Sequence, residues 1–224
     1  MNQSNLPDEL QEKPRLAPLV FLITEEDGAV FEWIIRNKNK LREMGYKHIN
    51  LEQSCDEPID SLLIKCDVIT AGREAILAKP EKKALDAETT QWYMGLKNYP
   101  YILGMSNLLK NLADEWPISF IDIPAAEILK NPGQSPELIA PLEALKAKRE
   151  KKFADEIVES SHSNNGGTIT IIGSNHHTVD REIQKLDPQL MSSALFIALS
   201  QFHPYVAPIE PVLLEMIDQH RKSS

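Results

Sequence analysis

Two adjacent histidines, His176 and His177, are the residues of this sequence whose type and position most clearly suggest chemistry. They follow a β-branched run at 168–172 and Gly173, and a helical pattern begins after Thr178. This pattern predicts a buried strand, a loop that carries both imidazoles, and then a helix. In open α/β sheets such loops bind ligands, because they are free to vary above a rigid scaffold.

Acidic residues are predicted at the ends of the other strands. The first predicted strand is followed by Glu25 and Asp27, the second ends in Glu52, and the third ends in Asp122. A strand, a helix and a second strand in this order form a right-handed crossover with parallel strands. We therefore expect Glu25, Asp27 and Glu52 to lie at one edge of the sheet.

A cluster of Glu25, Asp27, Glu52 and His176 would support either of two chemistries. Oxygen ligands with one imidazole suit divalent ions such as Mn²⁺, with Zn²⁺ less favoured, and a bound metal makes hydroxide available from water. Without a metal, crowded carboxylates raise one another's pKa, and one that stays protonated near neutral pH serves as general acid or base beside His176. Arg149 would orient a carboxylate or clamp an anionic substrate group.

Structural roles explain the same residues and remain open. The acids at 25–27 suit the positive end of the dipole of the following helix, and acids at strand ends also serve as turn residues. Arg149 and Glu150 lie in a charge-rich helical segment, where i,i+4 pairs on a solvated face are common. His177 is also consistent with a residue at a helix start.

The composition narrows the classes of function. The 224 residues carry a net charge of −9, and no Lys/Arg cluster with interleaved aromatic residues offsets it, so nucleic acid is not expected as a partner. Cys55 and Cys66 lack a metal-ligand spacing and indicate a reduced compartment. No apolar run reaches the roughly 18 residues of a transmembrane helix, and no secretory signal is recognisable. We expect a soluble, cytoplasmic protein, with export by a route that reads no N-terminal signal left open.

The hydrophobic pattern predicts one α/β domain at 18–221, with a central, mainly parallel sheet flanked by helices. A flexible N-terminal tail is expected at 1–17, and a helical insertion or lid at 56–98. Strands are predicted at 18–23, 48–52, 118–124, 168–173 and 194–201, and the main helices at 29–44, 101–116, 136–160 and 209–220.

Four short motifs follow one another along the chain: Leu51-Glu52, Phe120-Ile-Asp122-Ile-Pro124, Arg149-Glu150-Lys-Lys-Phe153-Ala154 and Gly173-Ser-Asn-His176. In this order and separation they resemble the motifs of the superfamily that includes TraB pheromone-shutdown proteins, Tiki-type metalloproteases, erythromycin-esterase-like proteins and ChaN-like haem-binding lipoproteins. The first motif of that superfamily, Gly-Glu-x-His, is altered here. Thr24 stands in place of the glycine and Asp27 in place of the histidine. This points to a degenerate site or to a changed metal set.

The resemblance implies a pocket at the carboxyl ends of the strands, with two groups of residues. Glu25, Asp27, Glu52 and His176 would be catalytic or would bind a divalent metal such as Mn or Zn. Residues expected to bind the substrate are Asp122, Arg149, Glu150, Asn175 and His177.

Two hypotheses of function follow. The first is a hydrolase-like site of the esterase or metalloprotease type, working with or without a metal, that acts on a small molecule or a peptide. The alternative is a catalytically inactive homologue that binds a small molecule, haem or a protein.

Overall fold

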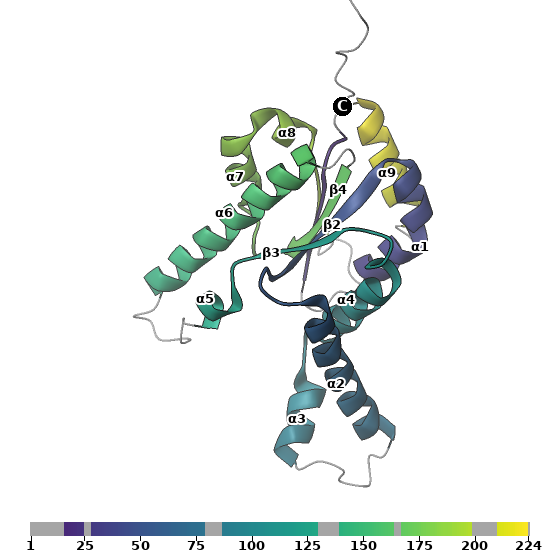
Figure 1. Ribbon diagram of the computed structural model, residues 1–224, viewed down its shortest axis with the longest axis vertical. Coiled ribbons are helices and arrows are strands. Elements are labelled where there is room, and N and C mark those ends of the chain that lie inside the picture. The colour runs from purple at the N-terminus through teal and green to yellow at the C-terminus, as the bar shows by residue number, and fades with distance from the viewer. Residues whose placement is uncertain are drawn as a thin grey trace, which may run out of the picture.

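A parallel five-stranded sheet lies at the centre of the molecule (Figure 1). The computed structural model describes residues 16–24, 28–78, 87–129, 139–163, 167–198 and 210–223. The strands are β1 (Leu19–Ile23), β2 (Tyr46–Ser54), β3 (Ile118–Asp122), β4 (Gly167–Gly173) and β5 (Leu195–Ala198). Their order is β3-β2-β4-β1-β5, and every neighbouring pair is parallel. The predicted α/β class with a central parallel sheet is confirmed.

The middle of the sheet is apolar on both faces. β1 and β4 pair from Leu19 opposite Ile169 to Ile23 opposite Gly173, and nearly all residues of both strands are buried. Continuous apolar runs of this kind form strands that are covered by helices on both sides. Both strands could therefore be predicted within a residue of their observed bounds.

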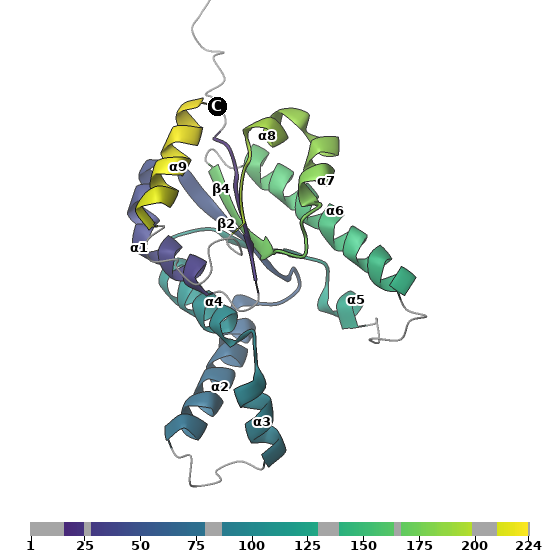
Figure 2. The ribbon, with the colours of Figure 1, turned by 180° about the vertical axis from the view of Figure 1, so that it is seen from behind.

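Helices cover both faces of the sheet (Figure 2). α1 (Ala29–Glu43), α4 (Tyr99–Leu112) and α9 (Glu210–Ser223) lie on one face, where they share an apolar core with Phe21 and Ile171. α6 (Ile139–Ser163), α7 (Val179–Leu186) and α8 (Pro188–Ser193) lie on the other face, where they pack against Val20 and Ile172. Successive residues of a strand point to opposite faces, which explains why neighbouring residues belong to different cores.

A glycine ends α1 and turns the chain toward β2. Gly45 has a φ of 102°, a backbone conformation that glycine adopts without the steric cost of a Cβ. Its N–H donates to the carbonyl oxygen of Arg42 at 3.0 Å and satisfies part of the helix end. The glycine stop predicted for this helix is therefore confirmed.

Two helices project from the body of the molecule. α2 (Ile59–Ala78) and α3 (Ala87–Gly95) extend away from the sheet in Figures 1 and 2, and we call this pair the arm. The helices are joined by a hydrogen bond from Arg73 Nη1 to the carbonyl oxygen of Tyr93 at 3.0 Å. α2 also packs against α4 in the body. The insertion predicted at 56–98 is therefore helical over much of its length.

Several predicted boundaries were wrong. α4 begins two residues before 101 and ends at Leu112, because Pro100 suits the first turn of a helix. The helical pattern after Thr178 is broken at Asp187, whose side chain caps α8 by accepting from the backbone N–H groups of two residues in the next turn. α5 (Ala125–Leu129), a short helix after β3, was not predicted. Most of the predicted tail and residues 199–201 of the last predicted strand lie outside the described residues.

Among the described helices, none combines the length and the apolar composition that crossing a bilayer requires.

Candidate functional site

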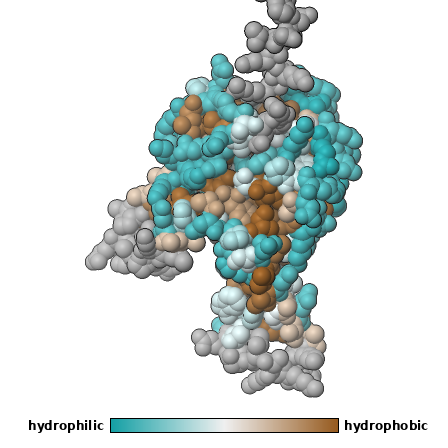
Figure 3. All heavy atoms as spheres, in the orientation of Figure 1, coloured by the Kyte–Doolittle hydropathy of each residue, from teal (hydrophilic) through white to brown (hydrophobic). Residues whose placement is uncertain are grey.

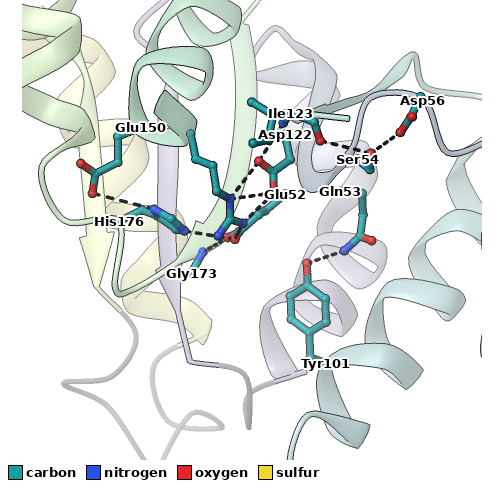
Figure 4. A network of polar contacts seen from close by, with 11 residues as sticks. Glu52, Gln53, Ser54, Asp56, Tyr101, Asp122, Ile123, Glu150, Gly173 and His176 are labelled. Atoms are coloured by element: carbon teal, nitrogen blue, oxygen red, sulfur yellow. Dashed lines mark hydrogen bonds and ion pairs between the residues drawn. The ribbon is translucent and has the colours of Figure 1, made fainter. Parts of the chain in front are cut away.

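Charged side chains from four elements meet at the carboxyl edge of the sheet (Figure 4). Glu52 lies near the end of β2 and Asp122 is the last residue of β3. Arg149 comes from α6, and His176 from the loop after β4. Parallel pairing places the ends of β2, β3 and β4 side by side, so residues far apart in the sequence lie within contact distance.

Arg149 joins two carboxylates. Its Nε lies 2.9 Å and 3.0 Å from the two carboxylate oxygens of Asp122, and its Nη2 lies 2.6 Å from Asp122 Oδ2. The same Nη2 lies 2.6 Å from Glu52 Oε1. Burial by itself would lower the pKa of Arg149, but the hydrogen bonds and charges of Asp122 and Glu52 outweigh it and raise that pKa above its usual value. The guanidinium is thus a permanent cation between β2 and β3.

The carboxylate of Glu52 is fully engaged. Its Oε2 accepts from the backbone N–H of Gly173, and its Oε1 lies 2.6 Å from Arg149 Nη2 and 3.2 Å from His176 Nε2. Burial acts to raise the pKa of Glu52, but these three groups together hold it below its usual value. Glycine leaves room here, because a Cβ at position 173 would lie 2.8 Å from Asn175 Oδ1 and 3.1 Å from Glu52 Oε2. The charged form of Glu52 is the form that this site stabilises.

His176 lies between two carboxylates in a nearly dry position, with an exposed fraction of 1%. Its Nε2 is 3.2 Å from Glu52 Oε1 and its Nδ1 is 3.8 Å from Glu150 Oε1 (Figure 4). At these distances neither ring nitrogen makes a hydrogen bond of good geometry with a described residue. The ring of Phe153 meets the imidazole edge to face at 5.0 Å and fixes its plane.

The carboxylate of Glu150 is also bound at the oxygen that faces away from His176. The hydroxyl of Thr178 donates to Glu150 Oε2, so that Oε1 is the oxygen directed at His176. Lys146 Nζ lies 3.9 Å from the same Oε1, one helical turn earlier. Thr178 therefore fixes the orientation of the carboxylate that flanks the imidazole.

The structure brings together five of the predicted residues: Glu52, Asp122, Arg149, Glu150 and His176. Two others, Asn175 and His177, are exposed in the loop after β4 and make no hydrogen bond or ion pair with the described residues. Glu25 and Asp27 lie outside the described residues. Only Glu52 and His176 of the predicted catalytic set are therefore placed.

The donor atoms of these residues bear on the predicted metal site. In the part of the chain that the structure describes, no group of three or more His, Cys, Asp and Glu side chains could hold a metal ion. Glu52 and Asp122 direct their oxygens at Arg149 and backbone N–H groups, so the guanidinium occupies the place that a cation would take between them. These residues do not fit a metal, and a metal held with Glu25 and Asp27 stays a prediction.

Sequence reasoning missed two residues at this edge. The pattern around Thr178 indicates only the start of the following helix, because one hydroxyl in a loop carries no signal of its partner. Tyr101, at the start of α4, accepts a hydrogen bond from Gln53 Nε2 at 3.3 Å. Burial raises its pKa, and the nearby charges of Glu52 and Asp122 raise it further, so the phenol stays protonated.

No protein-family model, curated protein or solved structure matches this chain.

Proposed function

We propose that this edge of the sheet is a hydrolase-type site, similar to those of the TraB, Tiki and erythromycin-esterase-like superfamily, which cleaves an ester or amide bond of a small molecule or peptide. The observation that carries the proposal is a buried histidine between two carboxylates, Glu52 and Glu150, from different elements. A carboxylate that orients an imidazole is the arrangement of many acid and base catalysts.

The burial of these charges also supports a functional role. Apolar residues of similar size often hold a fold together as well as a buried ion-pair network does, because desolvation of the charges offsets most of their attraction. Here Asp122, Glu150 and His176 are all buried at the end of a parallel sheet. Titratable groups gathered in this way are more frequent at functional sites than elsewhere.

In the proposed reaction the Glu52–His176 pair accepts a proton from water. Glu52 is the accessible end of the pair, with 17% of its side chain exposed. The resulting hydroxide attacks the carbonyl carbon, and the pair returns the proton to the leaving alcohol or amine. Arg149 Nη1 makes no hydrogen bond with a described residue, so it can donate to the oxyanion that develops in the transition state.

A second candidate function rests on the saturation of Glu52. This carboxylate already accepts from Arg149 and Gly173 and contacts His176, and a carboxylate with so many partners is a weak base. The observation favours a catalytically inactive homologue that binds a small molecule, haem or a protein at the same edge.

Hydrolysis assays of the purified protein separate the two functions. The wild type is assayed with generic nitrophenyl esters and a quenched peptide library, beside His176→Ala, His176→Asn and Glu52→Gln. Loss of the acid or base should lower kcat/KM by about 10²- to 10⁴-fold. The matched control is His162→Ala, since His162 is an exposed histidine that pairs with Asp187 at 2.8 Å, away from this network. Thermal unfolding of every variant shows which ones remain folded.

The outcomes assign the function. Turnover that the His176 variants lose and His162→Ala keeps supports the hydrolase. Equal turnover in folded His176→Asn and in the wild type contradicts it. No turnover by the wild type, together with haem or small-molecule binding that shifts its unfolding temperature, supports the binding module. Assays with added Mn²⁺ or Zn²⁺ and with a chelator test the predicted metal directly.

A further inference from the structure

Exposed apolar side chains gather on the arm. Nine large hydrophobic residues are exposed in the described part of the chain, and five of them belong to α2 and α3: Ile64, Val68, Leu77, Trp92 and Met94. In Figure 3 a band of apolar surface runs from the body down onto the arm. Exposed apolar residues that cluster in this way mark interaction surfaces, whereas scattered ones carry no such meaning.

One face of α2 repeats its apolar residues at coiled-coil spacing. The exposed residues Ile64, Val68, Ala71, Ala75 and Ala78 follow one another at steps of four, three, four and three, and we call them the seam. These steps are the alternation of the two core positions of a heptad repeat. The opposite face of α2, with the buried Leu62 and Cys66, packs toward the core. The seam is thus a second helix-packing face without a partner in the described structure.

We propose that the seam binds the seam of a second copy of this chain, in a parallel two-helix arrangement with two-fold symmetry. The period of 3.5 residues fits another helix, and the alanines let two helices approach closely. When two identical seams pair, the same apolar surface is buried on both copies, as in most homodimers. The net charge of −9 disfavours an anionic membrane as the occupant.

The charges beside the seam set the direction of the pairing. One flank carries the acids Asp60, Asp67 and Glu74, of which Asp67 pairs with Lys110 of α4. The other flank carries Lys65, which pairs with Glu57 of its own chain at 2.8 Å while 59% of its side chain stays exposed. In a parallel pair Asp60 lies opposite Lys65 of the partner subunit, and the same contact occurs twice by symmetry. An antiparallel pair would place one acidic flank against the other, which the like charges oppose.

Self-association is tested by sedimentation of the full chain, from low micromolar to several hundred micromolar concentration. We expect a reversible monomer–dimer equilibrium in the wild type. Val68→Lys should weaken the dimer by at least about tenfold, because a seam residue becomes charged. The matched control is Val212→Lys, since Val212 is 49% exposed and Val68 57% exposed, but Val212 belongs to α9 on the body. Both sites are exposed, so both variants should remain folded.

Cross-linking tests the parallel direction. Val68→Cys in a Cys55→Ser background should form a disulfide-linked dimer on mild oxidation, because equal core positions meet in a parallel pair. The buried Cys66 is retained. Val212→Cys in the same background should stay monomeric. Asp60→Lys should weaken association, and adding Lys65→Glu should restore it.

Three results would overturn the inference: a wild type that is monomeric at every concentration, equal weakening by Val68→Lys and Val212→Lys, or a monomer that binds lipid vesicles through the arm. Each is independent of hydrolysis, so failure here leaves the proposed function untouched.

Discussion

Replacement of Arg149 by methionine tests whether charge holds the network together. The guanidinium makes three of its contacts with Asp122, which is 3% exposed, and one with Glu52. Removal of one partner from a buried ion pair costs about 3–5 kcal/mol, because the other charge stays buried without compensation. The Arg149 side chain is 21% exposed, so water reaches part of the vacated site. We therefore expect a loss near the lower limit, about 3 kcal/mol, in the free energy of unfolding by urea.

Two further variants make this prediction specific. Adding Asp122→Asn to Arg149→Met should recover part of the loss, because the amide removes the unpaired charge. Arg42→Met is the surface control, since Arg42 lies 3.3 Å from Glu115 with 44% of its side chain exposed, and its cost should stay within about 1 kcal/mol. If Arg149→Met costs no more than Arg42→Met, or if the double variant is no more stable than Arg149→Met, the buried-charge reasoning is wrong.

Three other variants test the contacts around Glu52 and Glu150. The pKa of Glu52 is lower in the folded chain than in the unfolded chain. Its stabilising effect is therefore complete at a pH above the unfolded-state pKa and is lost as the pH falls through the folded-state pKa. The difference in unfolding free energy between the wild type and Glu52→Gln should shrink on acidification. Gly173→Ala should cost about 1–3 kcal/mol, measured by urea unfolding, because the added Cβ would lie 2.8 Å from Asn175 Oδ1 and 3.1 Å from Glu52 Oε2. A cost of zero would show that both side chains move aside freely. Thr178→Val should cost about 1–3 kcal/mol in the same assay, because Glu150 loses the hydroxyl that donates to it. Thr178→Ser keeps that hydroxyl and should cost less. Equal costs of the two substitutions would contradict the role of Thr178 in orienting Glu150.

The approach of Glu52 to His176 could be predicted because parallel strands share a direction. A carboxylate at the end of β2 and a loop after β4 must lie at one edge once the crossover is recognised. Apolar runs alone were enough to indicate β1 and β4, since strands covered on both faces leave a continuous pattern.

The sequence could not show which way the long side chains turn. Arg149 and Glu150 are neighbours on α6, and their sequence pattern is equally consistent with charges on a solvated helix face. Only the rotation of the helix against the sheet decides that Glu150 is buried and that Arg149 reaches Asp122. The direction in which the arm projects could not be predicted either, because α2 carries apolar residues on both its packed face and its exposed face.

Two neighbouring residues near the end of β2 connect regions that lie on opposite sides of the sheet. Glu52 reaches the charged network beneath α6, while Gln53 donates to Tyr101 at the foot of the arm. Adjacent strand residues point in opposite directions, so a single peptide unit links the two contacts. The end of β2 is therefore anchored on both faces of the sheet, through Glu52 to Arg149 on one side and through Gln53 to Tyr101 on the other.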